Sequence, residues 1–345
     1  MLSEISHLNK DELLLEVKDL KKYFAIRRGT IKKTSGTVKA VDGVNLFVKK
    51  GETLGLVGES GCGKTTTGRT IIRLLEPTGG EILFNDPTQG WIDLAKMDRK
   101  QMFTVRSNMQ IIFQDPFSSL DPRMTVERII SEPLVINKIA KGEELHDTIT
   151  ELMRTVGMRP EFRSRYPHAF SGGQRQRIGI ARALALNPKL IICDEPVSAL
   201  DVSIQAQVLN LLEDLQRDLN LTYIFVAHDL SVVEHISDRV AVMYVGRLVE
   251  VADTEALYYS PKHPYTEALM AAVPKPDPRK RDRPIKLPGE VASPANPPSG
   301  CYFHPRCRYA KDICSSEAPP LIEVEPLQYS ACHFASELKL RGVMG

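Results

Sequence analysis

The chain has 345 residues, which is more than a single small domain usually holds. Its 45 Lys and Arg residues nearly balance its 43 Asp and Glu residues, and the net charge of +2 gives no electrostatic support for a nucleic-acid partner. No run of about 18 apolar residues is present, and the segment from Met1 to Glu12 is too polar for a secretory signal. We therefore expect no membrane-spanning helix and a cytoplasmic location.

Three short apolar runs predict buried strands, at residues 53–57, 190–193 and 223–227. Helical patterns lie between them. The clearest covers residues 204–219, where apolar side chains recur at helical spacing: Val208, Leu211, Leu212, Leu215 and Leu219. Continuous apolar strands that alternate with helices favour an α/β fold, with a mainly parallel sheet covered on both faces.

The first strand is followed by a glycine-rich loop, residues 58–65, that fits the pattern G-x-x-x-x-G-K-[ST] in full. Glycines let the backbone curl so that its N–H groups point at phosphate oxygens, and the next helix adds positive potential at its N-terminus. In this pattern Lys64 contacts the β- and γ-phosphates, and the Thr65 hydroxyl ligates Mg²⁺, whereas Cys62 only fills the loop. The predicted nucleotide-binding residues here are Gly58, Glu59, Ser60, Gly61, Cys62, Gly63, Lys64, Thr65 and Thr66.

A second short motif, Phe-Ser-Gly-Gly-Gln at residues 170–174, precedes a helical pattern that runs through Leu184. Ser171 is suited to cap that helix, and Gly172 and Gly173 expose backbone N–H groups to an anion. One chain cannot easily bring both anion sites to one γ-phosphate, but two chains face to face can. We therefore expect a dimer in which each chain uses Ser171, Gly172, Gly173 and Gln174 to clamp the nucleotide held by the other.

The strand at residues 190–193 ends in two carboxylates, Asp194 and Glu195. Asp194 is placed to hold the shell of a Mg²⁺ ion. Glu195 lies one residue further along and is the better candidate for polarising an attacking water. Both carboxylates could simply end a strand, but the complete phosphate-binding loop upstream favours the chemical role.

The composition changes near Pro261, and residues 274–298 are rich in proline: Pro274, Pro276, Pro278, Pro284, Pro288, Pro294, Pro297 and Pro298. Proline fixes φ and has no N–H to donate, so this stretch is expected to be an extended connector. We therefore divide the chain into a domain of residues 1–260 and a small Pro/Cys-rich module of residues 261–345.

Four of the six cysteines crowd together in this module: Cys301, Cys307, Cys314 and Cys332. In a cytosolic chain such a cluster suggests a metal site before it suggests disulfides. No gap is C-x-x-C, which disfavours a zinc ribbon, yet four thiolates suit either a tetrahedral Zn²⁺ or an iron–sulfur cluster. Because His304 and His333 could also serve as zinc ligands, the spacing alone leaves the choice open.

These motifs, in this order along the chain, resemble those of the ATP-binding-cassette ATPases. In that family residues 58–65 correspond to the Walker A loop, residues 170–174 to the signature motif, with Phe170 where Leu is commoner, and residues 190–195 to the Walker B strand. The resemblance implies a nucleotide-binding domain with a RecA-like core, an antiparallel β subdomain and a helical signature subdomain.

The same resemblance implies roles for four further residues. Gln114 matches the glutamine of the Q-loop, which senses Mg²⁺ and contacts the membrane partner, and Asp201 closes the D-loop, which communicates across the dimer. His228 matches the switch histidine that contacts the γ-phosphate. Phe24 looks like the aromatic platform for adenine, although the neighbouring Tyr23 could fill that role.

The C-terminal module is similar to the extension of oligopeptide/dipeptide importer ATPases, on the stretches at residues 263–266, 288–290 and 301–307. Some members of that group carry a [4Fe–4S] cluster on four such cysteines. The resemblance thus implies a structural [4Fe–4S] cluster, with zinc and with free or disulfide-bonded thiols as alternatives. Its four ligands would be Cys301, Cys307, Cys314 and Cys332.

The function implied is ATP hydrolysis, with Mg²⁺, that powers a peptide importer from the cytoplasmic face of the cell membrane. Glu195 and His228 would assist hydrolysis, and Gln114 would link it to the membrane partner. The expected partners are a second, different ATPase subunit, two transmembrane permease subunits and, indirectly, an extracytoplasmic solute-binding protein.

Importers of oligosaccharides and of nickel use related ATPases, so these solutes are alternatives to peptides. Superfamily members that act on DNA insert long coiled coils before the signature, and those that act on ribosomes usually hold two cassettes; this chain has neither.

Overall fold

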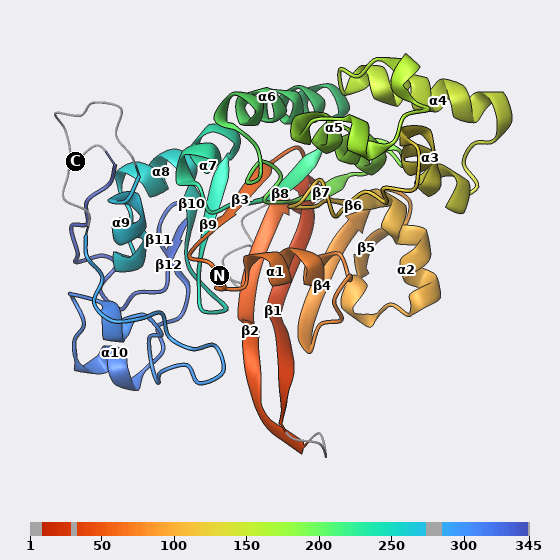
Figure 1. The fold of residues 1–345 in the computed structure, drawn as a ribbon. Helices are drawn as coiled ribbons and strands as arrows, with labels where there is room; N and C mark the ends of the chain where they lie inside the picture. The colour runs from red at the N-terminus through yellow and green to blue at the C-terminus, as the bar shows by residue number, and fades with distance from the viewer. Residues whose placement is uncertain (1–8, 29–32, 274–284, 344–345) are drawn as a thin grey trace. The chain divides into compact units, whose positions relative to one another are not determined.

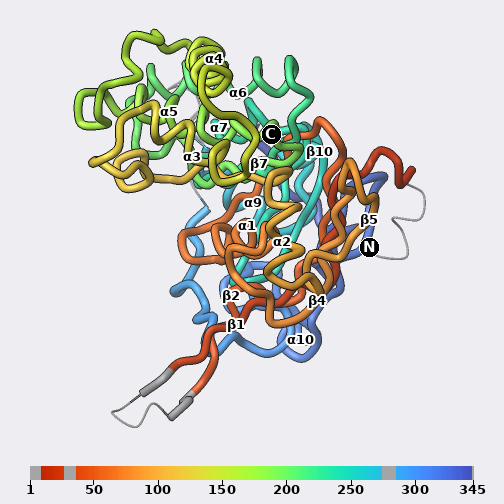
Figure 2. The backbone as a smooth tube through the Cα atoms, turned by 90° about the vertical axis from the view of Figure 1, so that its right-hand side faces the viewer, coloured from red at the N-terminus to blue at the C-terminus, as the bar shows by residue number. Residues whose placement is uncertain are grey.

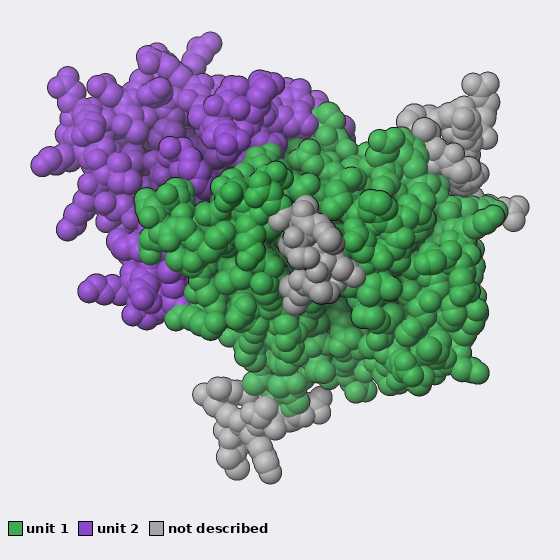
Figure 3. Space-filling view, turned by 180° about the vertical axis from the view of Figure 1, so that it is seen from behind, with its two compact units in different colours: residues 1–96, 227–345 green, residues 97–226 purple. Residues whose placement is uncertain are grey.

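A computed structural model of the protein describes residues 9–28, 33–273 and 285–343. The chain folds into two compact units, drawn in green and purple in Figure 3. Unit 1 combines residues 1–96 with residues 227–345, and unit 2 comprises residues 97–226. Among the described residues, no helix combines the length and the apolar character needed to cross a membrane.

Unit 1 contains an antiparallel sheet with the strand order β2-β1-β4-β5. Its strands are β1 (Leu13–Arg28), β2 (Lys33–Lys49), β4 (Gly79–Asp86) and β5 (Gly90–Asp93). β1 and β2 run side by side along their length (Figure 2). Alternate residues of β4, including Ile82 and Phe84, are buried, so one face of this sheet packs on the core.

A second group of strands in unit 1 follows the order β11-β12-β10-β9-β3 (Figure 1). Its members are β3 (Thr53–Val57), β9 (Arg239–Tyr244), β10 (Arg247–Asp253), β11 (Ile322–Glu325) and β12 (Gln328–Ser330). β3 and β9 are parallel and every residue in them is buried, which confirms the first predicted strand. The helices of unit 1 are α1 (Lys64–Ile71), α7 (Leu230–Ile236), α8 (Thr254–Tyr259), α9 (Pro264–Met270) and α10 (Asp312–Ser316).

Unit 2 contains three parallel strands in the order β8-β7-β6: β6 (Met109–Ile112), β7 (Leu190–Asp194) and β8 (Thr222–Val226). Its helices are α2 (Arg99–Val105), α3 (Val126–Ile136), α4 (Gly142–Thr155), α5 (Gly172–Leu184) and α6 (Val202–Leu219). The two remaining predicted strands are confirmed to within one residue. The predicted helix at 204–219 is confirmed as α6, which buries Val208, Leu212 and Leu215.

The C-terminal segment is joined to the rest of unit 1 around Glu250 of β10. Its buried carboxylate accepts hydrogen bonds from the backbone N–H groups of Lys262 (2.6 Å) and His263 (2.9 Å) and from the Gln328 side chain (3.1 Å). Burial raises the pKa of Glu250 to about 7. β12 also pairs with β10. The C-terminal residues that are described therefore pack on the strands of unit 1.

The predicted proline connector lies only partly within the described residues. Pro274, Pro276, Pro278 and Pro284 are outside them. From residue 285 to residue 300 the chain forms neither helix nor strand, in agreement with an extended segment. The division at about residue 260 stays a prediction.

Candidate functional site

The glycine-rich loop connects β3 to α1 in unit 1. Gly58 and Gly63 have left-handed φ angles of 147° and 110°. A Cβ at Gly58 would lie 2.1 Å from the carbonyl oxygen of Met243, and one at Gly63 would lie 2.1 Å from that of Ala40. Only glycine is compatible with such contacts, so neighbouring strands fix the loop in its curled form. Gly63 is also the residue that precedes α1, and no side chain caps that helix.

Lys64 is buried and its ammonium folds back over the loop. Its Nζ donates to the carbonyl oxygens of Gly58 (2.7 Å) and Glu59 (3.1 Å). A cation held over a curled, glycine-rich backbone at a helix N-terminus is an arrangement suited to a phosphate chain. Cys62 is also buried, and burial is the largest influence on its thiol and raises the pKa, which agrees with a filler role.

Two other predicted residues of unit 1 are on the surface. Phe24 in β1 is 39% exposed, and the Lys22 ammonium lies 4.9 Å from the centre of its ring. Tyr23, the alternative, is engaged elsewhere, because its hydroxyl donates to Asp42. An exposed ring is available for stacking, so Phe24 suits a platform better than Tyr23. His228 is exposed just before α7.

In unit 2 the structure brings together two residues that are far apart in sequence. The side-chain amide of Gln114 donates to Glu195 Oε2 over 2.9 Å. Asp194 is almost fully buried at the end of β7, whereas Glu195 follows it with a left-handed φ of 47°. Non-glycine residues rarely adopt this conformation, and such strain concentrates at functional sites. The backbone N–H of Glu195 donates to Val226 of β8 (2.9 Å), which holds the strained residue in place.

The signature residues form the start of α5. Ser171 Oγ accepts from the Gln174 N–H (3.4 Å), and the Gln174 side chain accepts from the Ser171 N–H (3.1 Å), which is a complete capping box. A Cβ at Gly173 would lie 2.4 Å from the Ile204 side chain, so glycine allows α5 to approach α6 closely. Asp201 directly precedes α6.

The four C-terminal cysteines line one small cavity, together with aromatic and histidine side chains. No cysteine forms a disulfide. Burial, with a smaller contribution from the neighbouring cysteines, raises the pKa of Cys301, that of Cys307 to about 11 and that of Cys332 to about 12. Across the ranges that the structure describes, however, no three His, Cys, Asp or Glu side chains form a group that could hold a metal ion.

Two partners of the phosphate-binding loop could not be predicted from the sequence. Arg306 forms an ion pair with the Glu59 carboxylate, and the Tyr265 hydroxyl accepts from the Glu59 N–H. Both belong to stretches that carried the resemblance in the C-terminal module. No local pattern could have paired them with a loop that lies more than 200 residues earlier.

Comparisons with known proteins agree with this geometry. Residues 41–198 match the family described as ABC transporter, and residues 249–314 match the C-terminal region of oligopeptide/dipeptide transporters. The oligopeptide transport ATP-binding protein AppF of Bacillus subtilis (strain 168) is 55% identical, over 94% of this chain and 98% of its own. The YkfD protein of the same strain, named a putative oligopeptide transport ATP-binding protein, is 51% identical over 93% of this chain and 95% of its own.

Solved structures share the fold. A dimeric ATP-binding cassette in a post-hydrolysis state, bound to ADP and Pi, has a TM-score of 0.61 and 28% identity, and the match covers 70% of this chain and 99% of that one. CbiO1 from Clostridium perfringens, part of the ABC transporter complex CbiONQ, has a TM-score of 0.60 and 28% identity, with coverage of 72% and 91%. These similarities confirm the predicted α/β fold of an ATP-binding cassette.

Proposed function

We propose that this chain, which belongs to the ABC transporter family, is the ATP-hydrolysing subunit of a peptide importer. The observation that carries the proposal is the phosphate-binding loop, with buried Lys64 held over a curled backbone at the uncapped start of α1. The similarity to oligopeptide transport ATP-binding proteins extends over nearly the whole chain, and the C-terminal match supports peptides as the solute. Oligosaccharides and nickel are the alternative solutes.

The roles of the residues follow from their chemistry. Lys64 and the loop amides bind the phosphates of ATP. Thr65, Asp194 and Gln114 would hold Mg²⁺, which neutralises charge on the phosphates when it is bound. Glu195 accepts a proton from the attacking water, and its bond to Gln114 orients the carboxylate. The remaining assignments are His228 at the γ-phosphate, Phe24 at adenine and Asp201 at the dimer interface.

The partners complete a site that one chain cannot complete alone. A second, different ATPase subunit contributes its own signature motif to the nucleotide bound by this chain. In return, the signature motif of this chain contacts the partner's nucleotide through Ser171, Gly172, Gly173 and Gln174. Closure is passed through the Gln114 region to two permease subunits at the cytoplasmic face of the membrane. An extracytoplasmic solute-binding protein delivers the peptide.

Glu195→Gln tests the catalytic role. The variant keeps ATP binding but loses about a hundredfold or more in turnover, because the amide cannot accept the proton. Turnover is measured as phosphate release by the complex with its partner subunits, and ATP binding is measured on the same samples. Glu151→Gln, on the exposed surface of α4, is the matched control and keeps full activity. Near-normal hydrolysis in Glu195→Gln would contradict the assignment.

The four C-terminal cysteines are part of the same proposal, as the ligands of a structural [4Fe–4S] site. The convergence of Cys301, Cys307, Cys314 and Cys332 on one cavity supports it. Zn²⁺ and free or disulfide-bonded thiols are the alternatives at this site. Once bound, the cluster would cross-link four parts of the segment.

Anaerobic purification with the partner subunits tests this site, followed by iron, sulfide and zinc analysis and an absorption spectrum. The expected result is about four irons and four sulfides per chain, the content of one [4Fe–4S] cluster, lost in Cys307→Ser. Zinc, or no metal, would remove the cluster from the proposal. The ATPase assignment would stand, because it rests on other residues.

A further inference from the structure

The seven-residue segment from Cys301 to Cys307 touches the cassette at three points. Tyr302 donates a hydrogen bond to Asp42 of β2, over 2.8 Å. Phe303 is fully buried among aromatic side chains. Arg306 reaches the phosphate-binding loop. The segment therefore begins and ends with a cysteine. The three residues that contact the phosphate-binding loop or the strands that support it lie between these two cysteines.

The third anchor is an ion pair with the loop itself. Arg306 Nη1 lies 2.9 Å from Glu59 Oε2 and Nη2 lies 3.2 Å from Oε1, so the guanidinium binds the carboxylate with two parallel hydrogen bonds. The Arg306 side chain is only 9% exposed. The backbone N–H of Glu59 donates to the Tyr265 hydroxyl over 2.9 Å. Two C-terminal residues thus hold both the side chain and the backbone of one loop residue.

The aromatic side chains make this arrangement rigid. The Phe303 ring lies 5.3 Å from that of Tyr244 and 5.4 Å from that of Tyr265, centre to centre, and the two tyrosine rings are 4.7 Å apart. All three are fully buried. Close-packed rings of this kind have few alternative rotamers, so the position of the segment determines the position of the Tyr265 hydroxyl.

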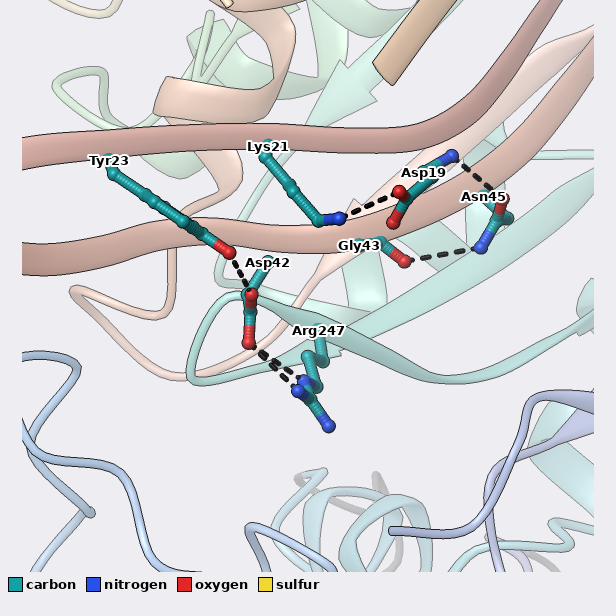
Figure 4. A network of polar contacts seen from close by, with 7 residues as sticks. All are labelled: Asp19, Lys21, Tyr23, Asp42, Gly43, Asn45 and Arg247. Atoms are coloured by element: carbon teal, nitrogen blue, oxygen red, sulfur yellow. Dashed lines mark hydrogen bonds and ion pairs between the residues drawn. The ribbon is translucent and has the colours of Figure 1, made fainter. Parts of the chain in front are cut away.

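The first anchor is tied to the same loop by a separate route. Figure 4 shows the side chains of Tyr23 and Arg247 converging on Asp42, and Tyr302 adds a third partner to this carboxylate. Gly246, next to Arg247, donates its N–H to the carbonyl of Cys62 over 2.8 Å. The segment is therefore connected to both ends of the stretch from Glu59 to Cys62.

We propose that Arg306 is a positioning residue for the phosphate-binding loop, acting through Glu59; this rests on the proposed binding of ATP to that loop. A carboxylate beside a loop that receives a polyphosphate repels it, and the Arg306 guanidinium neutralises that charge. The ion pair also fixes the carbonyl of Glu59, which accepts from Lys64. The affinity for nucleotide therefore depends on a side chain of the segment from Cys301 to Cys307.

Equilibrium binding of ATP to the purified chain, in EDTA to prevent hydrolysis, tests the proposal. Arg306→Ala is expected to weaken ATP affinity about tenfold, within the usual range of site-to-site coupling. Arg306→Lys is expected to keep part of the ATP affinity that Arg306→Ala loses, since a lysine keeps the charge but cannot form the bidentate hydrogen bonds. Arg308→Ala is the matched control on the same segment: Arg308 pairs with Glu267, at 2.9 Å, and its loss leaves the affinity within about twofold.

The double variant Glu59→Gln/Arg306→Ala separates positioning from general support of the fold. Removing the carboxylate removes the repulsion, so the double variant binds ATP more tightly than Arg306→Ala alone. A purely structural arginine would give no such recovery. Wild-type affinity in Arg306→Ala, or no recovery in the double variant, would overturn the proposal.

Two further measurements complete the test. If Arg306→Ala does not fold, Tyr265→Phe replaces it, and a loss of about threefold is expected from one hydrogen bond to the Glu59 backbone; unchanged affinity would count against the proposal. If the wild-type chain itself does not bind ATP, the proposed function fails. If it binds ATP and Lys64→Ala does not, only the results for Arg306 and Tyr265 decide the inference.

Discussion

The two helices that begin at the predicted anion sites begin in different ways. α1 follows Gly63, which has a left-handed φ of 110° and no side chain to cap the helix. α5 follows Ser171, which forms a reciprocal capping box with Gln174. The first helix start is shaped by backbone and neighbouring strands, whereas the second supplies polar side chains of its own.

This difference indicates when each site can act. At α1 no capping side chain has to leave before an anion binds. At α5 a phosphate competes with the Ser171–Gln174 bonds, which cost about 1 kcal/mol to give up. A site that is satisfied by itself and opens only for a strong ligand suits a role that begins when a second chain presents its nucleotide.

The largest effect is expected at α1. Lys64→Ala removes the only side-chain cation of the loop and lowers ATP affinity about a hundredfold or more, since two charge-assisted hydrogen bonds to phosphate are lost. Equilibrium binding of ATP measures the loss. Lys50→Ala, an exposed lysine just before β3, is the control and binds normally. Retained micromolar affinity in Lys64→Ala would show that the loop does not bind phosphates as proposed.

A smaller effect is expected at α5, where Ser171→Ala can be matched with Asp98→Ala. Asp98 forms the same kind of capping box, with Gln101 at the start of α2. Both variants lose about 1 kcal/mol in the free energy of unfolding. Only Ser171→Ala is expected to lose hydrolysis as well, about tenfold, because Ser171 is proposed to contact the partner's nucleotide as well. Chemical denaturation and phosphate release measure the two effects; equal hydrolysis in both variants would remove the special role of Ser171.

The smallest effect is expected for Cys62→Ala, inside the loop. Burial raises the pKa of this thiol, and the proposed phosphate contacts belong to Gly63 and Lys64, so ATP affinity is expected to change by less than about twofold. Iodoacetamide at neutral pH leaves Cys62 unmodified in the native chain, as peptide mapping can verify. Rapid modification, or a large loss of affinity, would mean that Cys62 takes part in the chemistry.

The sequence alone predicted those features whose signal is local. The phosphate-binding loop, the buried strands and α6 were found because their residues lie next to one another or recur with a fixed period. The bond between Gln114 and Glu195 joins residues 81 positions apart, and only the resemblance to a family placed both at one site. Arg306 and Glu59 carry no shared pattern at all, so their pairing required the fold.

The antiparallel sheet shows the same limit. Its long strands β1 and β2 contain several register shifts, which interrupt the alternation of apolar and polar residues that identifies a strand in a sequence. This part of the fold was predicted from the resemblance to a family.

The role of the cysteines could not be predicted from the sequence for another reason, since the spacing gives the number of thiols but not the distances between them in the fold.

Unit 1 is formed from two separate stretches of the sequence, and this has a consequence for its folding during synthesis on the ribosome. Glu59 and Arg306 are 247 residues apart, with all of unit 2 made between them. At about 5–20 residues per second, roughly 12 to 50 seconds pass between the synthesis of the loop and that of its arginine. During this interval the nascent chain has a complete phosphate-binding motif without the ion pair to Glu59, and for most of the interval it also lacks the strand β9. If the loop binds ATP as proposed, its full affinity is therefore expected only after the C-terminal segment has emerged.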